Sequence, residues 1–431
     1  MGEKQGLNRR KFMKLGGAAL VGGLLASGCG SQGGAPAVAK KPTVTLGANG
    51  YSLNSFRTML QELGFTKQTG IELNFSERPN ASNECTTKMT SAIRAGSTPY
   101  DVLNFEDELA VPFARAGWLV PLDDVIAPEV WEDFTPELLA MTKTWDQYKG
   151  ETFRVHHNFE ATYFWYRKDW FDAKGLEPPR TWDEVAQMGK VFNDKSKGIW
   201  ATEDGMTKGA TLNVYLAWVA RQAGGNLYDV DDSLRTALQY IHDLMYKHET
   251  MNPASLQKDY DQQNGDYLGD RVAFMRQWPF VYDVARKEQS WYSEEKLTCI
   301  LPPVGPGGKA VSTYAAGWGF GIPKTSRNIE AAKELIRFMI SKENVVKMID
   351  YSTWFLNARH SVLKAAGNEG FAKFLKMYTD AGVISTRPHH PKYGEAVSIL
   401  EDAGSAFLSN QVSLDETMKR TKEKMERIAE A

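Results

Sequence analysis

Apolar and polar positions alternate along the first part of the stretch 153–171, and a continuous apolar run then follows. One set of alternate positions is apolar or aromatic: Phe153, Val155, His157 and Phe159. A period of two is typical of a strand with one covered face. The run Tyr-Phe-Trp-Tyr at 163–166 is too bulky for a half-exposed edge. It predicts a strand that is covered on both faces.

The same stretch carries polar side chains into the predicted sheet: His156, His157, Asn158 and Glu160. Polar groups cost free energy when they are buried without partners. They must therefore either satisfy one another or line a cleft that receives a ligand. We interpret the stretch as a crossover between two lobes and take His157, Asn158 and Glu160 as candidate ligand contacts. Because side chains alternate along a strand, Asn158 and Glu160 share one face and His157 lies on the other.

Strand and helix patterns alternate from Pro42 onward. Strands are predicted at 44–46, 70–75 and 100–103, with helices between them. This order predicts βαβ units, an α/β fold and a mostly parallel sheet. Ligands of such sheets bind where loops leave the carboxyl ends of the strands. The loops expected at 47–54 and 104–108 offer the candidates Asn49, Tyr51, Phe105, Asp107 and Glu108.

The first 41 residues have the pattern of an export signal and a tether. Arg9 and Arg10 precede a short, glycine-rich apolar segment, and small residues lead up to Cys29. A charged start, a short apolar segment and a small-residue cleavage site predict a signal peptide over 1–28. The paired arginines are typical of twin-arginine export. The ending resembles a bacterial lipobox, so we expect a lipid on Cys29, a flexible tether over 29–41 and attachment to the outer face of the cell membrane.

The charge of the chain argues against one class of partner, and its cysteine content argues against a disulfide-rich fold. Residues 29–431 hold 46 Lys and Arg against 52 Asp and Glu, so the body of the chain is mildly acidic. A mildly acidic chain without a basic run argues against a nucleic-acid partner. Cys85 and Cys299 could pair in an oxidising compartment, but two cysteines form no disulfide framework, and we expect both thiols to be free.

Several segments resemble, in order, the landmarks of family 1 extracellular solute-binding proteins, the sugar receptors of ABC importers. The resembling segments are 68–71, 88–102, 116–122, 166–171, 178–184, 269–278, 301–308 and 319–324. Arg167 departs from the family pattern, which usually has Asn or Asp there. The resemblance implies a two-lobed periplasmic-binding fold of class II with three hinge crossovers. The implied lobes are 42–159 with 303–356, and 160–302 with 357–431. It also implies an ABC permease as partner.

Aromatic content supports a sugar site. The chain holds 12 Trp and 17 Tyr, and carbohydrate faces pack on aromatic rings while their hydroxyls need polar partners. The resemblance places a stacking tryptophan at Trp278 and a sugar-contacting glutamate at Glu160. Further candidates follow from position: Trp318, Trp354, Arg359 and Tyr393. Each has an ordinary alternative as a core or surface residue, and Asp107 and Glu108 could form an exposed acidic turn.

Sequence motifs of enzymes are absent. The chain lacks a Gly-x-Ser-x-Gly elbow, a Walker loop and a His-Glu-x-x-His motif, so we expect neither catalysis nor a metal or cofactor. The expected function is a monomeric binding lipoprotein that captures a carbohydrate between two lobes and delivers it to a membrane permease. A sugar sensor for a membrane kinase and a receptor for a phosphorylated polyol or another anionic solute are the alternatives.

Overall fold

The computed structural model describes residues 41–79, 82–209, 211–287, 292–294, 296–306, 313–349, 351–365 and 370–430. Residues 41–431 form one compact unit. The expected signal peptide, Cys29 and most of the tether lie outside the described residues. In the described part of the chain, no helix is both long and apolar enough to cross a membrane.

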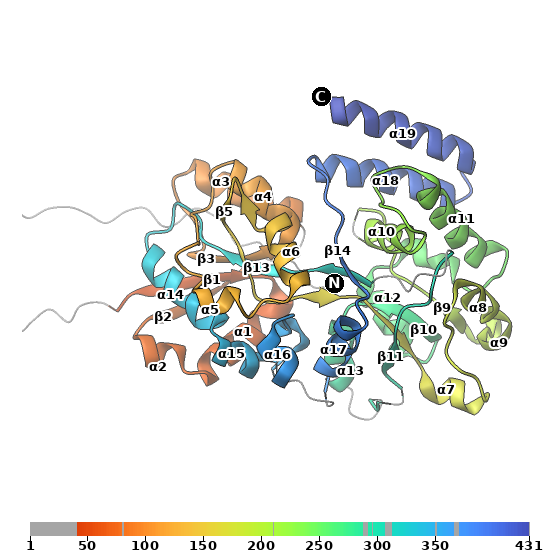
Figure 1. Ribbon diagram of the computed structural model, residues 1–431, viewed down its shortest axis with the longest axis horizontal. Helices are drawn as coiled ribbons and strands as arrows, with labels where there is room; N and C mark the ends of the chain where they lie inside the picture. The colour runs from red at the N-terminus through yellow and green to blue at the C-terminus, as the bar shows by residue number, and fades with distance from the viewer. Residues whose placement is uncertain are drawn as a thin grey trace, which may run out of the picture. The chain divides into compact units, whose positions relative to one another are not determined.

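The first sheet lies in the left part of Figure 1 and contains the first three strands of the chain. Its order is β2 (Glu72–Glu77), β1 (Thr43–Ala48), β3 (Val102–Glu106), β13 (Trp318–Gly321) and β6 (Val155–His156). Strands β1, β2 and β3 are parallel, and β13 is antiparallel to both of its neighbours. Its helices are α1 (Gly50–Glu62), α2 (Phe65–Thr69), α3 (Ser82–Arg94), α4 (Asp107–Arg115), α5 (Pro128–Trp131), α6 (Pro136–Trp145), α14 (Ile329–Ile340), α15 (Lys342–Met348) and α16 (His360–Ala365).

The second sheet has the order β11 (Thr298–Ile300), β8 (Tyr163–Tyr166), β10 (Val272–Gln277) and β9 (Trp200–Thr202). Strand β8 is antiparallel to both neighbours, whereas β9 and β10 are parallel. Its helices are α7 (Lys168–Ala173), α8 (Trp182–Gln187), α9 (Gly189–Phe192), α10 (Leu212–Gln222), α11 (Asp232–Tyr246), α12 (Tyr260–Leu268), α13 (Phe280–Lys287), α17 (Ala372–Asp380), α18 (Tyr393–Leu408) and α19 (Leu414–Glu430). The short helical turns are η1 (Lys195–Lys197), η2 (Pro253–Gln257) and η3 (Thr353–Phe355).

A third, small sheet joins strands from three distant parts of the chain. Its order is β14 (Ile384–Thr386), β12 (Thr313–Ala316) and β7 (Glu160–Ala161). The stretch that begins at Phe153 therefore contributes β6 to the first sheet, β7 to the third and β8 to the second. This arrangement is that of a chain passing between two lobes. The exact lobe limits remain a prediction.

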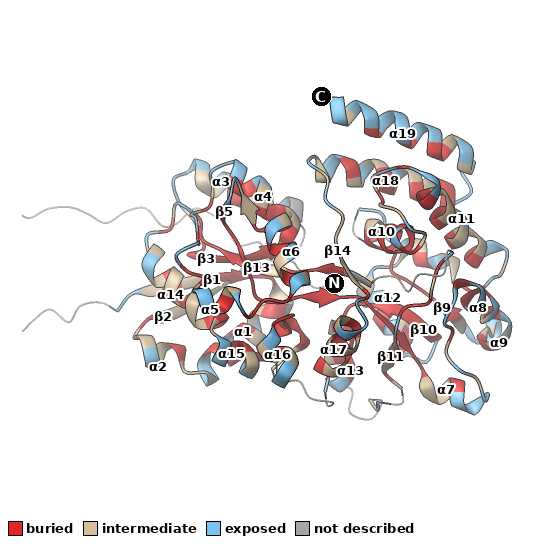
Figure 2. Ribbon diagram, viewed as in Figure 1, coloured by how far each residue is buried: buried red, intermediate tan, exposed pale blue. Residues whose placement is uncertain are grey.

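Apolar burial follows the sheets, whose strands are largely buried (Figure 2). Leu46, Val102 and Phe320 are fully buried in the first core, and Phe274 and Leu238 are buried in the second. Cys85 and Cys299 are buried free thiols, which confirms the prediction. The α/β class is also confirmed, although the sheets are mixed and parallel pairing does not dominate the second one.

The expected loop at 104–108 is replaced by regular structure. Strand β3 ends at Glu106 and helix α4 begins at Asp107 with no residue between them. Acidic residues in a first helical turn interact favourably with the helix dipole, which explains the helical start at Asp107 and Glu108. The loop at 47–54 is likewise shortened, because α1 begins at Gly50.

Candidate functional site

The carboxyl ends of β1, β2 and β3 gather polar groups at one edge of the first sheet. Arg78, which follows β2, donates from Nη2 to Glu106 Oε2 at 2.9 Å and from Nε to the Asn104 carbonyl at 2.8 Å. Its guanidinium lies 5.0 Å from the centre of the Trp318 ring. Trp354 lies against the same ring, with centroids 4.8 Å apart. This edge thus combines aromatic faces with charged groups.

Several buried polar atoms next to this edge have no hydrogen-bond partner among the described residues. They include Asn49 Nδ2, His157 Nδ1 and Asn158 Nδ2. The other amide atom of Asn158 accepts from the Trp318 amide at 2.6 Å. Buried polar atoms are nearly always paired in folded proteins, so unpaired ones indicate a place for a ligand or a water molecule.

His157 is held as a neutral imidazole. Its Nε2 atom lies 2.7 Å from Asn104 Nδ2, which can only donate, so the proton of the ring resides on Nδ1. The ring stacks on Phe320 with centroids 4.6 Å apart. Burial lowers the pKa of His157 well below its usual value, and the nearby Arg154 lowers it further. The side chain is 1% exposed.

A second group forms around Arg387, just after β14. Arg387 Nη1 donates to Asp107 Oδ1 at 2.7 Å and also to Glu108 Oε2. Its guanidinium lies 5.9 Å from the Trp145 ring centre and 5.7 Å from that of Tyr393. Arg387 therefore connects the carboxyl-terminal segment of the chain to the start of helix α4.

The acids near Arg387 differ in their preferred protonation state. Burial, together with the charges of Asp107 and Asp283 and against the opposing charge of Arg387, raises the pKa of Glu160 to about 8. Burial also raises the pKa of Asp107. Burial acts in the same direction on Glu108, but the charge of Arg387 and hydrogen bonds outweigh it and lower the pKa of Glu108 to about 2. Glu108 is therefore the anionic partner of Arg387 at neutral pH.

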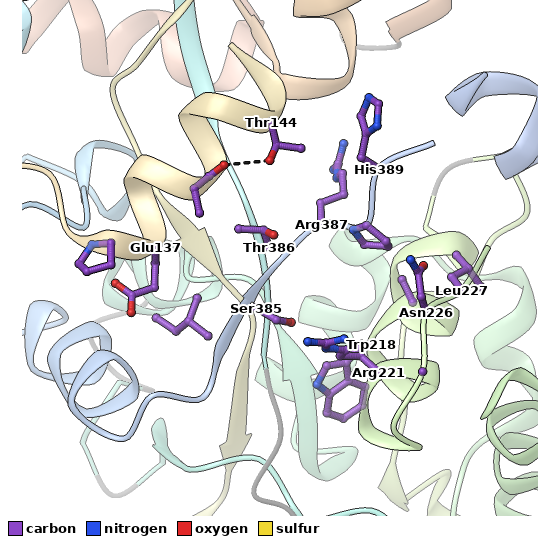
Figure 3. Close-up of a pocket in the computed structure, with 16 residues that line it drawn as sticks. Glu137, Thr144, Trp218, Arg221, Asn226, Leu227, Ser385, Thr386, Arg387 and His389 are labelled. Atoms are coloured by element: carbon purple, nitrogen blue, oxygen red, sulfur yellow. Dashed lines mark hydrogen bonds between the residues drawn. The ribbon is translucent and has the colours of Figure 1, made fainter. Parts of the chain in front are cut away.

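A cavity of about 540 Å³ begins at this group (Figure 3). Helix α6 bounds one side, α10 with the residues after it bounds the other, and the segment 384–389 runs between them. The lining residues are Pro136, Glu137, Ala140, Thr144, Ala217, Trp218, Arg221, Gly225, Asn226, Leu227, Ile384, Ser385, Thr386, Arg387, Pro388 and His389. Pockets of 300–1,000 Å³ are typical of small-molecule sites.

An aromatic group with a buried ion pair lies in the second core, behind Trp218. Arg276 donates to Asp204 from Nε at 3.0 Å. Its guanidinium lies within 6 Å of the ring centres of Tyr215, Trp218 and Tyr260. Trp218 therefore separates this ion pair from the cavity, because the same residue lines the cavity wall.

The structure brings some predicted site residues together and leaves others apart. Asp107, Glu108, Glu160 and Tyr393 gather around Arg387, and His157, Asn158, Trp318 and Trp354 gather at the sheet edge. Asn49 lies buried at the start of α1. The side chain of Tyr51 is outside the described part.

None of the predicted site residues whose side chains the structure describes is among those that line the cavity, and three of them are held by other contacts. Phe105 is buried against Phe113, with ring centroids 5.6 Å apart. Trp278 is 7% exposed and meets Tyr260 edge to face. Arg359 is buried and donates from Nε to Asp133 Oδ2 at 2.8 Å. Their predicted ligand contacts remain predictions.

Sequence reasoning missed Arg387, Trp145 and Trp218. Arg387 stands in the run Thr-Arg-Pro-His-His at 386–390, which has no regular period. Trp218 falls on a helix that is buried nearly all round. These residues can be recognised only from the acids and aromatic rings beside them, which come from distant parts of the chain. The local sequence pattern does not show such neighbours.

Comparison with known proteins agrees with this geometry. Residues 49–346 match the family described as bacterial extracellular solute-binding protein. A probable ABC transporter-binding protein of Deinococcus radiodurans is 28% identical over 42% of this chain and 45% of its own length. The maltotriose-binding protein of Pyrococcus abyssi is 23% identical over 68% of this chain and 61% of its own. The chain thus spans about half to three fifths of these two relatives.

A solved structure shows the same fold over nearly the whole chain. Maltose-bound MalE3 of T. maritima superposes with a TM-score of 0.76 and 24% identity, covering 90% of this chain and 99% of the other. Two α/β lobes joined by a small sheet define a two-lobed protein of the periplasmic-binding class. The chain belongs to the bacterial extracellular solute-binding proteins of family 1.

Proposed function

We propose that the protein captures a carbohydrate between its lobes and delivers it to the permease of an ABC importer. The observation that carries this proposal is the cavity of about 540 Å³, lined by α6 on one side and α10 on the other. A solute in that cavity touches both sides at once, so it stabilises the closed arrangement of the hinge. The names of the relatives, a transporter-binding protein and a maltotriose-binding protein, support the same class of function.

The chemistry of the site favours polyhydroxylated solutes over anionic ones. Trp218 lines the cavity, and the Trp145 and Tyr393 rings flank Arg387. Such rings provide faces for sugar C–H groups, while Asn226, Ser385 and Thr386 provide hydrogen bonds for hydroxyls. Of the two arginines that line the cavity, Arg387 already binds Asp107 and Glu108, and Arg221 is exposed on α10, where water screens its charge. A phosphorylated solute would have to compete with those carboxylates.

The lipoprotein role is part of the same proposal. A lipid on Cys29 and a tether over 29–41 would keep the receptor beside its permease at the outer face of the membrane. Cys29→Ser should release the protein from the membrane fraction in a fractionation experiment. Retention of that variant in the membrane would contradict the anchor and leave the binding site unaffected.

A thermal-unfolding screen against a panel of sugars tests the binding function. A solute at about 100 times its Kd adds roughly 2.7 kcal/mol to the free energy of unfolding. Trp218→Phe should weaken the shift for the hit, whereas Trp200→Phe, on a strand outside the cavity, should keep it. Trp278→Phe, measured in the same series, decides the predicted stacking role of Trp278. A panel that produces no shift with the unaltered protein would contradict carbohydrate binding.

A further inference from the structure

The small third sheet places an acid and a base on one face. Glu160 of β7 pairs with Ala316 of β12. On the other side of β12, the Arg387 amide donates to the Ala315 carbonyl at 3.0 Å, so Arg387 continues β14 beside Ala316. Neighbours across adjacent strands point to the same face, two strand spacings or roughly 10 Å apart at the backbone. The side chains of Glu160 and Arg387 therefore face the same space.

Three carboxyl groups lie near a single guanidinium in that space, and two of them bind it. Arg387 Nη1 binds Asp107 Oδ1 and Glu108 Oε2. Asp107 Oδ2 is buried and has no hydrogen-bond partner in the described part of the chain. Glu160 is 8% exposed, and among the described residues its carboxyl group forms no hydrogen bond or ion pair. Glu160 and Asp107 are thus more than nine-tenths buried, and each has a carboxyl oxygen without a hydrogen-bond partner among the described residues.

Buried carboxylates without partners are unfavourable, so the group must take up either protons or a cation. The raised pKa values of Glu160 and Asp107 mean that, without a ligand, these carboxyl groups tend to hold protons. Asp283, the remaining acid that acts on Glu160, is occupied, since its Oδ2 accepts from Ser352 Oγ at 2.6 Å and from the Thr353 amide at 2.9 Å. A cation would therefore be stabilised most strongly next to Glu160 and Asp107.

We propose that the solute carries a protonated amine, which binds Glu160 and Oδ2 of Asp107 while its hydroxyl-bearing part occupies the cavity beside Arg387. This inference rests on the proposed function and narrows its substrate class to amine-bearing polyhydroxylated compounds. An ammonium group offers three donors and no acceptor, which matches a pair of carboxylates. Charge-assisted hydrogen bonds are about twice as strong as neutral ones. The other cation of the cavity wall, Arg221, is exposed on α10, where water screens it.

Titration calorimetry with matched ligands tests the inference. The ligands share one sugar skeleton and carry a hydroxyl, an acetylated amine or an amine that stays protonated at pH 7. The protein is purified from Gly30 onward, so that it contains the whole compact unit. We expect the amine to bind at least about tenfold more tightly than the hydroxyl form. Binding of the amine should also release at least about one proton at pH 7, because the ammonium replaces the proton of Glu160 and part of a proton on Asp107. The release is measured in two buffers that differ in ionisation enthalpy.

Variants separate the charge of Glu160 from its shape. Glu160→Gln should cost the amine about tenfold more in affinity than it costs the hydroxyl form, and should lower proton release by close to one proton. Glu177→Gln, at a side chain that is 85% exposed, is the matched control and should change nothing. Equal affinity for the amine and hydroxyl forms would overturn the inference and leave carbohydrate binding intact. Failure of all three ligand forms on every skeleton tested would count against the proposed function as well.

Discussion

Glu160 governs the pH dependence that we expect of the ligand-free protein. Its pKa rises from 4.5 to about 8 on folding, because the carboxyl group is buried near Asp107 and Asp283. Between these values the folded chain holds a proton that the unfolded chain has released. The free energy of unfolding must therefore fall as pH rises from about 5 to 8, by up to about 1.4 kcal/mol per pH unit from this group. Asp107 contributes in the same direction.

Glu160→Gln should remove that part of the pH dependence. Glutamine keeps the shape of the protonated side chain, so the variant should match the parent near pH 5 and exceed its stability by about 2 kcal/mol or more at pH 8 to 9. Urea unfolding at a series of pH values measures the difference. The exposed Glu177→Gln serves as control. Parallel stability curves for Glu160→Gln and the parent would show that Glu160 ionises normally.

Some residues that the sequence singled out lie together in the structure, and their contacts with a ligand remain a prediction. Glu160, Asp107, Glu108 and Tyr393 were singled out, and all four gather around Arg387. Arg387 itself could not be predicted, because its importance depends on acids 279 and 280 residues away in the chain. The sequence does not show whether Trp278 packs in a core or contacts a ligand, because a tryptophan that follows a buried strand can do either. In the structure its ring meets Tyr260.

At the scale of elements, the junction between β12 and β13 tolerates no side chain at Gly317. A Cβ atom there would lie 2.3 Å from His156 Cδ2 and 2.7 Å from Met141 Cε. His156 cannot move freely, because its ring binds Asp146 and its Nε2 accepts from Arg154 Nη2 at 2.9 Å. The Gly317 carbonyl also accepts from Arg154 Nη1 at 3.0 Å. The close approach of two strands therefore depends on glycine.

Gly317→Ala should lower the free energy of unfolding by about 1–3 kcal/mol, the usual cost of overpacking a filled interior. Gly394→Ala is the matched control, since nothing lies within 4 Å of its Cβ position in helix α18. Alanine favours a helix over glycine, so the control should be neutral or slightly stabilising. Equal urea midpoints for the Gly317 variant and the parent would mean that His156 and its polar partners can move to make room for a methyl group.

Element prediction succeeded for the strands and failed at their ends. The βα order of residues 42–103 was read correctly from the apolar periods, and β1, β2 and β3 fall where strands were expected. The division of the stretch 153–171 among three sheets was not predicted, because a period of two does not show which strand is the pairing partner. The loop at 104–108 was predicted wrongly, since the acids that indicated a ligand loop begin a helix instead.

At the scale of the whole molecule, contacts from both sides converge on the segment after β14. Arg387 joins this segment to the start of α4, while its neighbours face α6 and α10 across the cavity. A second link runs through Asp283 of α13, which accepts hydrogen bonds from Ser352 and from Thr353, the first residue of η3. A solute that adds bonds in the cavity would work together with these links to hold the lobes closed.

The crystal structure of the protein with the best sugar from the thermal screen is the most direct test of the account. We expect the solute within the cavity, in contact with Trp218 from α10 and with Thr386 or Arg387 from the segment between the lobes. The same crystals would show whether a donor of the solute approaches Glu160. A sugar bound outside this cavity, or bound to one lobe alone, would contradict capture between the lobes.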